Sequence, residues 1–457
     1  MNMVKLAFTC VFMLGVTIFD ASTSALAQQS ESTKKQLQIS PKIANDYDSS
    51  FRLLASEAEQ EQGNAVPVIL RMVYEQQPFM KELYPRLHEF AEMDISDPKW
   101  KDFYFDRFAE QIIRAGAMSH ADWQYPLRSE RPYLILLPDI QSQRQLVDRG
   151  MTAWIRQQLS QGKTDKALQG IKAQFGCSRH CAATPIVVCH LVGLAIANSG
   201  FDNLELAIQA GECPNMYWAL ATLPPTLQDL GPMVRWELWA TPTRLSEPLP
   251  SIGNDKWIQI ANRFVDLYSE ASDDRYTREE GDALQKKMDL LAKDQLAKEL
   301  GFSVDEVERM TKEERIMRWI YLRYLQFRSN VEPLAYQSPK QIIAAKRTIE
   351  AANEKLLTES GAKSSPYLIM LPQGILACRN FERRSKFIQT IEAIRDYAGR
   401  HNGTLPAKLD DLHLVAPNDP FTEQQFVYEL NGKTARLSQE KIDGFSGVTF
   451  DYELTAK

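Results

Sequence analysis

The sequence predicts a mainly helical protein of stacked helical hairpins, followed by a small C-terminal unit of helix and sheet. Apolar residues recur at three-to-four spacing along much of the 457-residue chain, which is the period of an amphipathic helix. Short turns separate such segments between residues 140 and 240. Around Asn431-Gly432 the pattern changes to alternation, which predicts a β-hairpin.

Composition narrows the classes of protein to consider. The chain is 44% hydrophobic and 25% charged, as in ordinary globular proteins. These values exclude collagen, a long disordered tail and a polytopic membrane protein. The net charge of −6 leaves no basic footprint for nucleic acid.

Residues 1–27 are predicted to form a secretory signal. Lys5 precedes an apolar run from Leu6 to Phe19, and Ala25-Leu26-Ala27 supplies small residues at a cleavage site. The run has about 14 residues, whereas a membrane-spanning helix needs roughly 20. We therefore expect cleavage after Ala27 and export to the periplasm or the exterior, with no transmembrane segment in the mature chain.

The elements that follow begin with a leader. Residues 28–45 are rich in Gln, Ser and Lys and predict a flexible segment. A helical pattern starts near Phe51. Asp97-Pro98 predicts an N-cap with proline in the first turn, ahead of one helix that carries Trp100 through Ile113.

Residues 140–240 predict at least four consecutive helices. The third begins at Thr184-Pro185 and ends at Ser199-Gly200, and the fourth is capped by Asp202 and closed by Gly211. Antiparallel helices with short turns are typical of a tetratricopeptide-like array, although the period here is irregular. We therefore predict a stack of helical hairpins.

Proline-rich breaks suggest the domain limits. The sequence predicts a helical hairpin domain over 46–240, a linker over 241–254, a second helical region over 255–380 and a helix with a small sheet over 381–457. In the second region, Ser303 with Glu306 and Thr311 with Glu314 have the spacing of capping boxes. A further helix is predicted over 339–358.

The C-terminal unit is predicted to begin with one more helix, which includes Phe381 and Ala398. A hairpin over 425–437 follows, and a last strand over 448–454 extends the sheet. An exposed edge in this hairpin would favour a cell-envelope or secretion accessory protein that assembles by strand addition.

Several segments resemble a family of uncharacterised exported proteins from planctomycete-type bacteria. They are Asp122-Trp123, Leu136-Leu137-Pro138, Thr184-Pro185-Ile186, Pro214-Asn215-Met216-Tyr217-Trp218-Ala219-Leu220, Gly403-Thr404-Leu405-Pro406, Asn418-Asp419-Pro420-Phe421 and Tyr452-Glu453-Leu454. The resemblance covers most of residues 50–457. It implies export and a shared fold, and it transfers no catalytic residue.

A second, local resemblance covers about 391–437. A helix, Gly-x-x-Pro, Asp-Pro-Phe and a hairpin are similar to the C-terminal half of type II secretion pseudopilins. The chain lacks the N-terminal prepilin segment of that family, so the resemblance implies a small shared fold rather than pilus assembly.

The cysteines form the densest group of chemically active side chains. Cys177, His180 and Cys181 lie at helical spacing that can hold zinc, although no C-x-x-C pair accompanies them. Cys177, Cys181, Cys189 and Cys213 are also candidates for a disulfide, which export favours. Plain buried thiols are the third interpretation, and no cofactor is predicted.

Other motifs do not survive inspection. Gly162-Lys163-Thr164 and Gly432-Lys433-Thr434 end like phosphate-binding loops, but Gln157 and Val427 occupy the positions where the motif needs an earlier glycine.

Tyr217 and Trp218 are amphipathic rings near a helix start, and we mark them as a possible partner surface.

Taken as a sequence, the chain favours an exported helical scaffold or binding protein for an unknown protein or cell-envelope partner. No catalytic motif is present, and non-catalytic function is favoured. The alternatives are an unrecognised hydrolase or metal-dependent enzyme, and a cell-envelope or secretion accessory protein.

Overall fold

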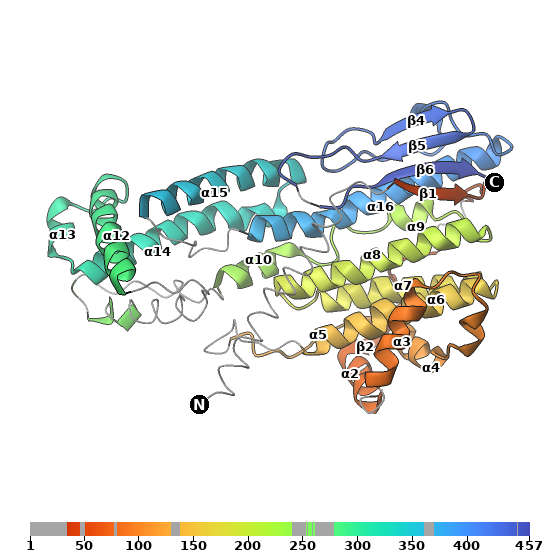
Figure 1. Cartoon of the computed structure of the whole chain (residues 1–457), viewed down its shortest axis with the longest axis horizontal. Coiled ribbons are helices and arrows are strands. Elements are labelled where there is room, and N and C mark those ends of the chain that lie inside the picture. The colour runs from red at the N-terminus through yellow and green to blue at the C-terminus, as the bar shows by residue number, and fades with distance from the viewer. Residues whose placement is uncertain are drawn as a thin grey trace. The chain divides into compact units, whose positions relative to one another are not determined.

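A computed structural model describes residues 34–45, 51–76, 80–128, 138–239, 253, 255–257, 259–260, 278–360, 370–445 and 447–457. The described residues confirm a mainly helical protein with a small C-terminal sheet (Figure 1). They fall into two compact units, one built from the described residues of 126–128 and 230–375, and the other from the rest.

The second of these units contains the C-terminal sheet and most of the long buried helices. Its helices are α2 (Ala65–Gln76), α3 (Met80–Glu92), η3 (Pro98–Asp102), α4 (Asp106–Ala117), α5 (Pro138–Gln143), the π-helix η5 (Arg144–Gly150), α6 (Met151–Ser160), α7 (Thr164–Cys181), α8 (Val187–Ala210), α9 (Tyr217–Ala221), most of α16 (Leu371–Arg400) and η7 (Leu409–Asp411). Helix α7 packs against α4, α6 and α8. A short parallel pair joins β2 (Glu61–Asn64) to β3 (Met118–His120).

Helix α8 differs from the sequence prediction. Two helices were expected to meet at Ser199-Gly200, but 24 residues run on without a break. A Cβ at Gly200 would lie 3.2 Å from the ring of Phe175, so this glycine allows close packing and does not end the helix. Gly211 does end it, with a φ of 95°.

Helix α8 is long and apolar enough to cross a membrane by length and composition, and among the described residues it is the one such helix. Of its apolar window, 61% is buried inside the protein. Burial on several sides explains why it lacks a single apolar stripe.

The helix predicted after Asp97-Pro98 is also interrupted. Asp97 caps as expected, with its carboxylate accepting from the Lys99 amide, but the helix that it caps is the short 3-10 segment η3. The chain is extended at Phe103, and α4 begins only at Asp106. The rings of Phe103 and Phe105 stack with their centroids 5.9 Å apart. Apolar contacts therefore stabilise the extended segment between the two helices.

The sheet has the strand order β1-β6-β5-β4. Its strands are β1 (Lys34–Ile39), β4 (Val427–Asn431), β5 (Thr434–Ser438) and β6 (Asp451–Ala456). The predicted hairpin is confirmed: β4 and β5 pair antiparallel, and Gly432 has a φ of 66° that suits the turn. Figure 1 shows the sheet lying along α16, where Phe387 meets Tyr452 at 5.2 Å.

Strand β1 lies within residues 28–45, where the sequence predicts a flexible leader. Residues 34–39 pair parallel with β6. Leu37 and Ile39 alternate with polar residues and are fully buried, so two apolar side chains are sufficient to add this segment to the sheet.

The other unit contains helices alone among its described residues. They are α10 (Leu230–Trp239), α12 (Arg278–Lys298), α13 (Val304–Arg309), α14 (Lys312–Val331), η6 (Glu332–Tyr336) and α15 (Pro339–Ser360). Ser303 and Glu306 form the predicted capping box, and Thr311 accepts from the Glu314 amide. Of the predicted 241–254 linker, only Gly253 lies within the described residues.

Candidate functional site

The cysteine cluster lies in the core. Cys177 and Cys181 of α7 and Cys189 of α8 are fully buried, and the Cys181 Sγ donates to the Cys189 carbonyl at 3.3 Å. Burial raises the pKa of Cys177 to about 12, and burial together with the neighbouring thiols raises the pKa of Cys181 well above its ordinary value. Reactive cysteines need a lowered pKa. The raised pKa values of Cys177 and Cys181 therefore favour thiols that pack in the core.

The two histidines of this region are buried as well. Burial lowers the pKa of His180 and of His190 to about 4. The His180 Nε2 atom has no hydrogen-bond partner, and its backbone carbonyl accepts from the Trp123 indole at 3.0 Å. Within the described ranges, no three His, Cys, Asp or Glu side chains are grouped as metal ligands would be.

Cys213 lies in a different environment, beside Glu392 and Arg395 of α16. Burial raises its pKa to about 12. All five described cysteines, Cys378 included, are buried in this structure. A disulfide among Cys177, Cys181, Cys189 and Cys213 stays a prediction.

Tyr217 and Trp218 meet edge-on, with ring centroids 5.0 Å apart. Tyr217 is 7% exposed, and its hydroxyl donates to the Val415 carbonyl at 2.8 Å. Asn215 fixes this helix start by accepting from the Tyr217 amide at 3.0 Å. Tyr217 therefore fastens α9 to the loop around Val415, and only Trp218 keeps a half-buried ring.

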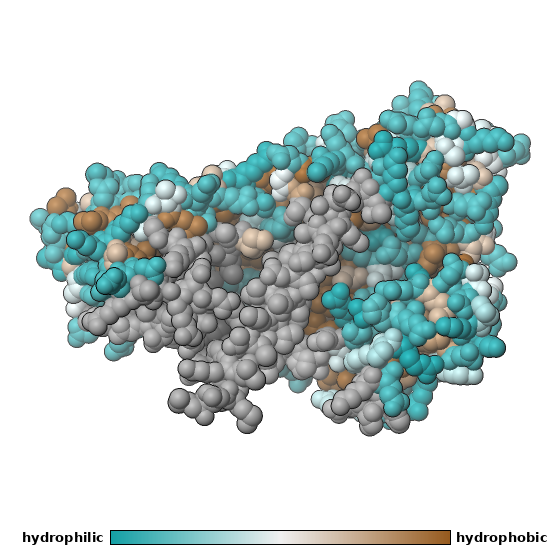
Figure 2. Space-filling model, viewed as in Figure 1, coloured by the Kyte–Doolittle hydropathy of each residue, from teal (hydrophilic) through white to brown (hydrophobic). Residues whose placement is uncertain are grey.

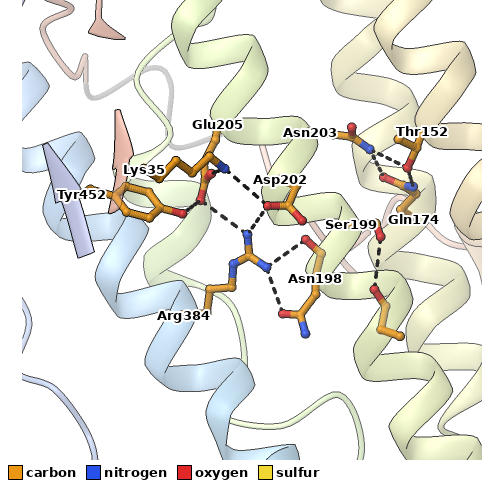
Figure 3. Close-up of polar contacts among 11 residues, drawn as sticks. Lys35, Thr152, Gln174, Asn198, Ser199, Asp202, Asn203, Glu205, Arg384 and Tyr452 are labelled. Carbon is orange, nitrogen blue, oxygen red and sulfur yellow. Dashed lines mark hydrogen bonds and ion pairs between the residues drawn. The ribbon is translucent and has the colours of Figure 1, made fainter. Parts of the chain in front are cut away.

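An ion-pair network that the sequence analysis did not predict joins four separate segments (Figure 3). Its centre is the buried Arg384 of α16, which donates to Asp202 at 2.8 Å and to Glu205 at 3.4 Å on α8. The guanidinium also donates to the Asn198 carbonyl at 3.1 Å and lies 4.8 Å from the ring centroid of Phe450. Although burial acts to lower the pKa of Arg384, the two carboxylates raise it.

Two strands complete this network. Lys35 of β1 pairs with Glu205 and, at 3.5 Å, with Asp202. The Tyr452 hydroxyl of β6 donates to Glu205 at 2.8 Å. Although burial acts to raise the pKa of Asp202, Arg384 and Lys35 hold it below its ordinary value. Two cations face two carboxylates, so the charges of the network balance.

A second set of polar contacts surrounds the π-helix η5. The Gln174 amide donates to the carbonyls of Val147 and Asp148, both at 3.3 Å. Asn203 of α8 donates to Gln174 at 2.9 Å and to Thr152 at 3.1 Å. In a π-helix the backbone hydrogen bonds join residues five apart instead of four. The Gln174 side-chain amide donates to two backbone carbonyls of this segment.

Asp148 lies on η5 and contacts Ser199 of α8. Burial raises its pKa, although hydrogen bonding from Ser199 and the charges of Arg144 and Arg149 act to lower it. A carboxyl group with a raised pKa is a candidate proton donor or acceptor.

The C-terminal sheet offers a different kind of site at its edge. Strand β4 pairs with β5 and is the last strand in the described sheet. Val427 is 41% exposed and Leu430 36% exposed. On the face drawn in Figure 2, the described surface is mainly hydrophilic, with scattered apolar spots.

Comparison with family models, curated proteins and solved structures finds no match to this chain.

Sequence reasoning could not have found the ion-pair network. Lys35, Glu205, Arg384 and Tyr452 are separated by 170, 179 and 68 positions along the chain (205−35, 384−205, 452−384). No local spacing connects them, and each taken alone resembles a solvated charge or a core aromatic.

Proposed function

We propose that the chain is an exported, non-catalytic binding protein whose irregular stack of helical hairpins supports a small sheet that captures a partner. The observation that carries this proposal is the unpaired edge of β4 within the described sheet. Unpaired strand edges are ready templates for an added strand.

The ion-pair network supports the proposal because it supplies the rigid support that an edge needs. Arg384, Glu205 and Tyr452 tie α16, α8 and β6 together through buried contacts. A preorganised sheet loses little conformational entropy when a partner binds.

The buried thiols and imidazoles support a non-catalytic role. The pKa shifts of Cys177, Cys181 and His180 all favour the neutral form. A buried thiol that stays protonated stabilises a core and is a poor nucleophile or metal ligand, since both roles need the thiolate.

Export and cell-envelope location are part of the same proposal. They rest on the predicted signal over 1–27 and on the resemblance to exported planctomycete-type proteins. The local resemblance to pseudopilins adds a possible secretion context for the sheet.

A site-specific photo-cross-linking experiment in the producing cells tests this function. A photoreactive phenylalanine analogue replaces Val427 on β4 in one strain and Tyr104, which is 80% exposed, in a control strain. We expect an exported chain beginning at Gln28, with a discrete cross-linked product from position 427 and none from position 104. Retention of the chain inside the cell, or equal products at both positions, would contradict the proposal.

A second candidate function is acid–base catalysis, and Asp148 is the observation that favours it. The carboxyl group has a raised pKa and lies beside Ser199 and two arginines. Chromogenic ester and glycoside substrates test it. Turnover that disappears in Asp148→Asn and persists in Asp165→Asn, at an exposed position on α7, would support the enzyme.

A further inference from the structure

The backbone register of the hairpin determines which groups face the open edge of β4. Asn431 pairs with Thr434 across a two-residue turn, and Glu429 pairs with Arg436. In such a hairpin the closing pair exchanges both hydrogen bonds, and every second pair does the same. The N–H and C=O groups of Tyr428 and Leu430 therefore point away from β5, toward the open edge.

The inner face of this edge is apolar. Tyr428 and Leu430 lie across from Leu437 and Ala435, which are fully or almost fully buried. The Tyr428 hydroxyl donates to the Pro406 carbonyl at 2.7 Å, so its ring is held in place beside the edge. A strand added at this edge would cover Leu430 if it carried apolar side chains on its inner face.

The outer face of the same strands carries charged side chains. Glu429 has a 57% exposed side chain and lies 4.0 Å from Arg436. The Arg436 guanidinium donates to both carboxylate oxygens of Asp451 at 2.9 Å. In the backbone register of β5 and β6, Arg436 lies opposite Glu453. Asp451 therefore takes the short contacts of the guanidinium, and the charge that a neighbouring strand can best complement belongs to Glu429.

A second copy of this chain is a poor occupant. The two-fold antiparallel register that pairs Tyr428 of each copy with Leu430 of the other is centred on Glu429. That register places Glu429 directly opposite itself, and like charges directly opposite are destabilising. The Glu429 charge therefore disfavours self-association in this register, which is a known role of charged side chains on edge strands.

From these observations, and resting on the proposed binding function, we infer that β4 captures an extended partner segment with apolar residues on one face and a Lys or Arg opposite Glu429. The main-chain groups of Tyr428 and Leu430 supply the hydrogen bonds, and Glu429 selects the charge. Backbone pairing with side-chain selection is the usual division of roles in strand addition.

A charge exchange with two peptides tests the inference. The lysine peptide is an acetylated nonapeptide of alternating threonine and valine with lysine replacing the central threonine, and the glutamate peptide carries glutamate there. Calorimetric titration into the full mature chain should show the lysine peptide binding about three- to tenfold more tightly, as expected for a cross-strand charge pair. With Glu429→Lys the preference should reverse.

A backbone variant makes the test independent of charge. Leu430→Pro removes an N–H that faces the open edge and leaves the β5 pairing of Glu429 and Asn431, since proline is tolerated on edge strands. Binding of the lysine peptide should fall about tenfold, because a carbonyl of the peptide loses its donor. Leu430→Ala serves as the matched control for the side chain, and circular dichroism confirms that both variants fold.

The outcomes separate this inference from the proposed function. No binding of either peptide, or a preference that Glu429→Lys leaves unchanged, would overturn the inference. If neither peptide bound but the cross-linked product at position 427 persisted, the proposed binding function would stand, while capture of a basic strand at this edge would be overturned.

Discussion

Arg384 shows how one residue can control the stability of several segments. Its guanidinium is buried between the rings of Phe201 and Phe450 and donates to Asp202 and Glu205. Burying charge is costly unless each charge has a partner. Removing this cation would leave the buried Glu205 with Lys35 as its sole cationic partner in the network.

We predict that Arg384→Gln lowers the free energy of unfolding by about 3 kcal/mol, because breaking a buried pair leaves an uncompensated carboxylate. Urea unfolding at neutral pH measures it. Arg114→Gln is the matched control: Arg114 pairs with Glu61 and both are exposed, so its loss should be below about 1 kcal/mol. Equal losses in the two variants would contradict the structural role of the network.

The buried histidines predict how stability depends on pH. His190 has a folded pKa of about 4 against an ordinary value of 6.5. Between these values the unfolded chain takes up a proton that the folded chain does not. Stability is therefore full above pH 6.5 and falls as the pH drops toward 4.

His190→Gln should remove this contribution. We predict that the loss of unfolding free energy between pH 7 and pH 5 becomes smaller by about 1–2 kcal/mol in the variant. His88→Gln, at an exposed position on α3, is the control and should keep the parent's pH dependence. Identical pH profiles for the parent and His190→Gln would show that His190 is not buried in its neutral form.

At the scale of elements, α4 and α7 depend on two glycines at their contact. A Cβ at Gly176 would lie 2.1 Å from the Gly116 carbonyl oxygen, and a Cβ at Gly116 would lie 2.8 Å from the Ala173 carbonyl oxygen. The helix backbones therefore touch at a distance that no larger residue permits.

Gly176→Ala should lower the free energy of unfolding by about 1–3 kcal/mol, since the added methyl forces the two backbones apart. Gly281→Ala, in α12 with nothing within 4 Å of the added atom, should instead raise it by up to about 1 kcal/mol through helix propensity. Thermal or urea unfolding of the two variants checks both signs. A neutral Gly176→Ala would mean that α4 and α7 pack less closely than described.

The elements also show what local sequence can and cannot predict. Turn and cap signals succeed where the chain responds only to its near neighbours, as at Ser303-x-x-Glu306 and Asn431-Gly432. They fail at Gly200, where the glycine is needed for contact with Phe175 on another helix. A single sequence does not distinguish a glycine that is required for packing against a distant segment from a glycine that is required for a turn.

For the whole molecule, the candidate site was predictable only in part. The hairpin and its possible role as an edge follow from alternation around Asn431-Gly432. The neighbours of that hairpin do not, because β1 joins the far end of the sheet from residues 34–39, with over 400 residues between the paired strands. The same distance in sequence hides the contact of Lys35 with Glu205.

The two edges of the sheet differ in what covers them. Lys35 on β1 belongs to the ion-pair network. Strand β4, in contrast, ends the described sheet, and the N–H and C=O groups of Tyr428 and Leu430 face its open edge. One edge is fixed to the helical body and the other is available for a partner strand.

Hydrogen–deuterium exchange at single-residue resolution distinguishes a fixed edge from an open one. In the free protein, the amides of Tyr428 and Leu430 should exchange quickly, while that of Glu429, bonded to β5, exchanges slowly. Saturating lysine peptide should slow Tyr428 and Leu430 and leave Glu429 unchanged. Slow exchange at Tyr428 and Leu430 before the peptide is added, or no change after it, would contradict an open binding edge on β4.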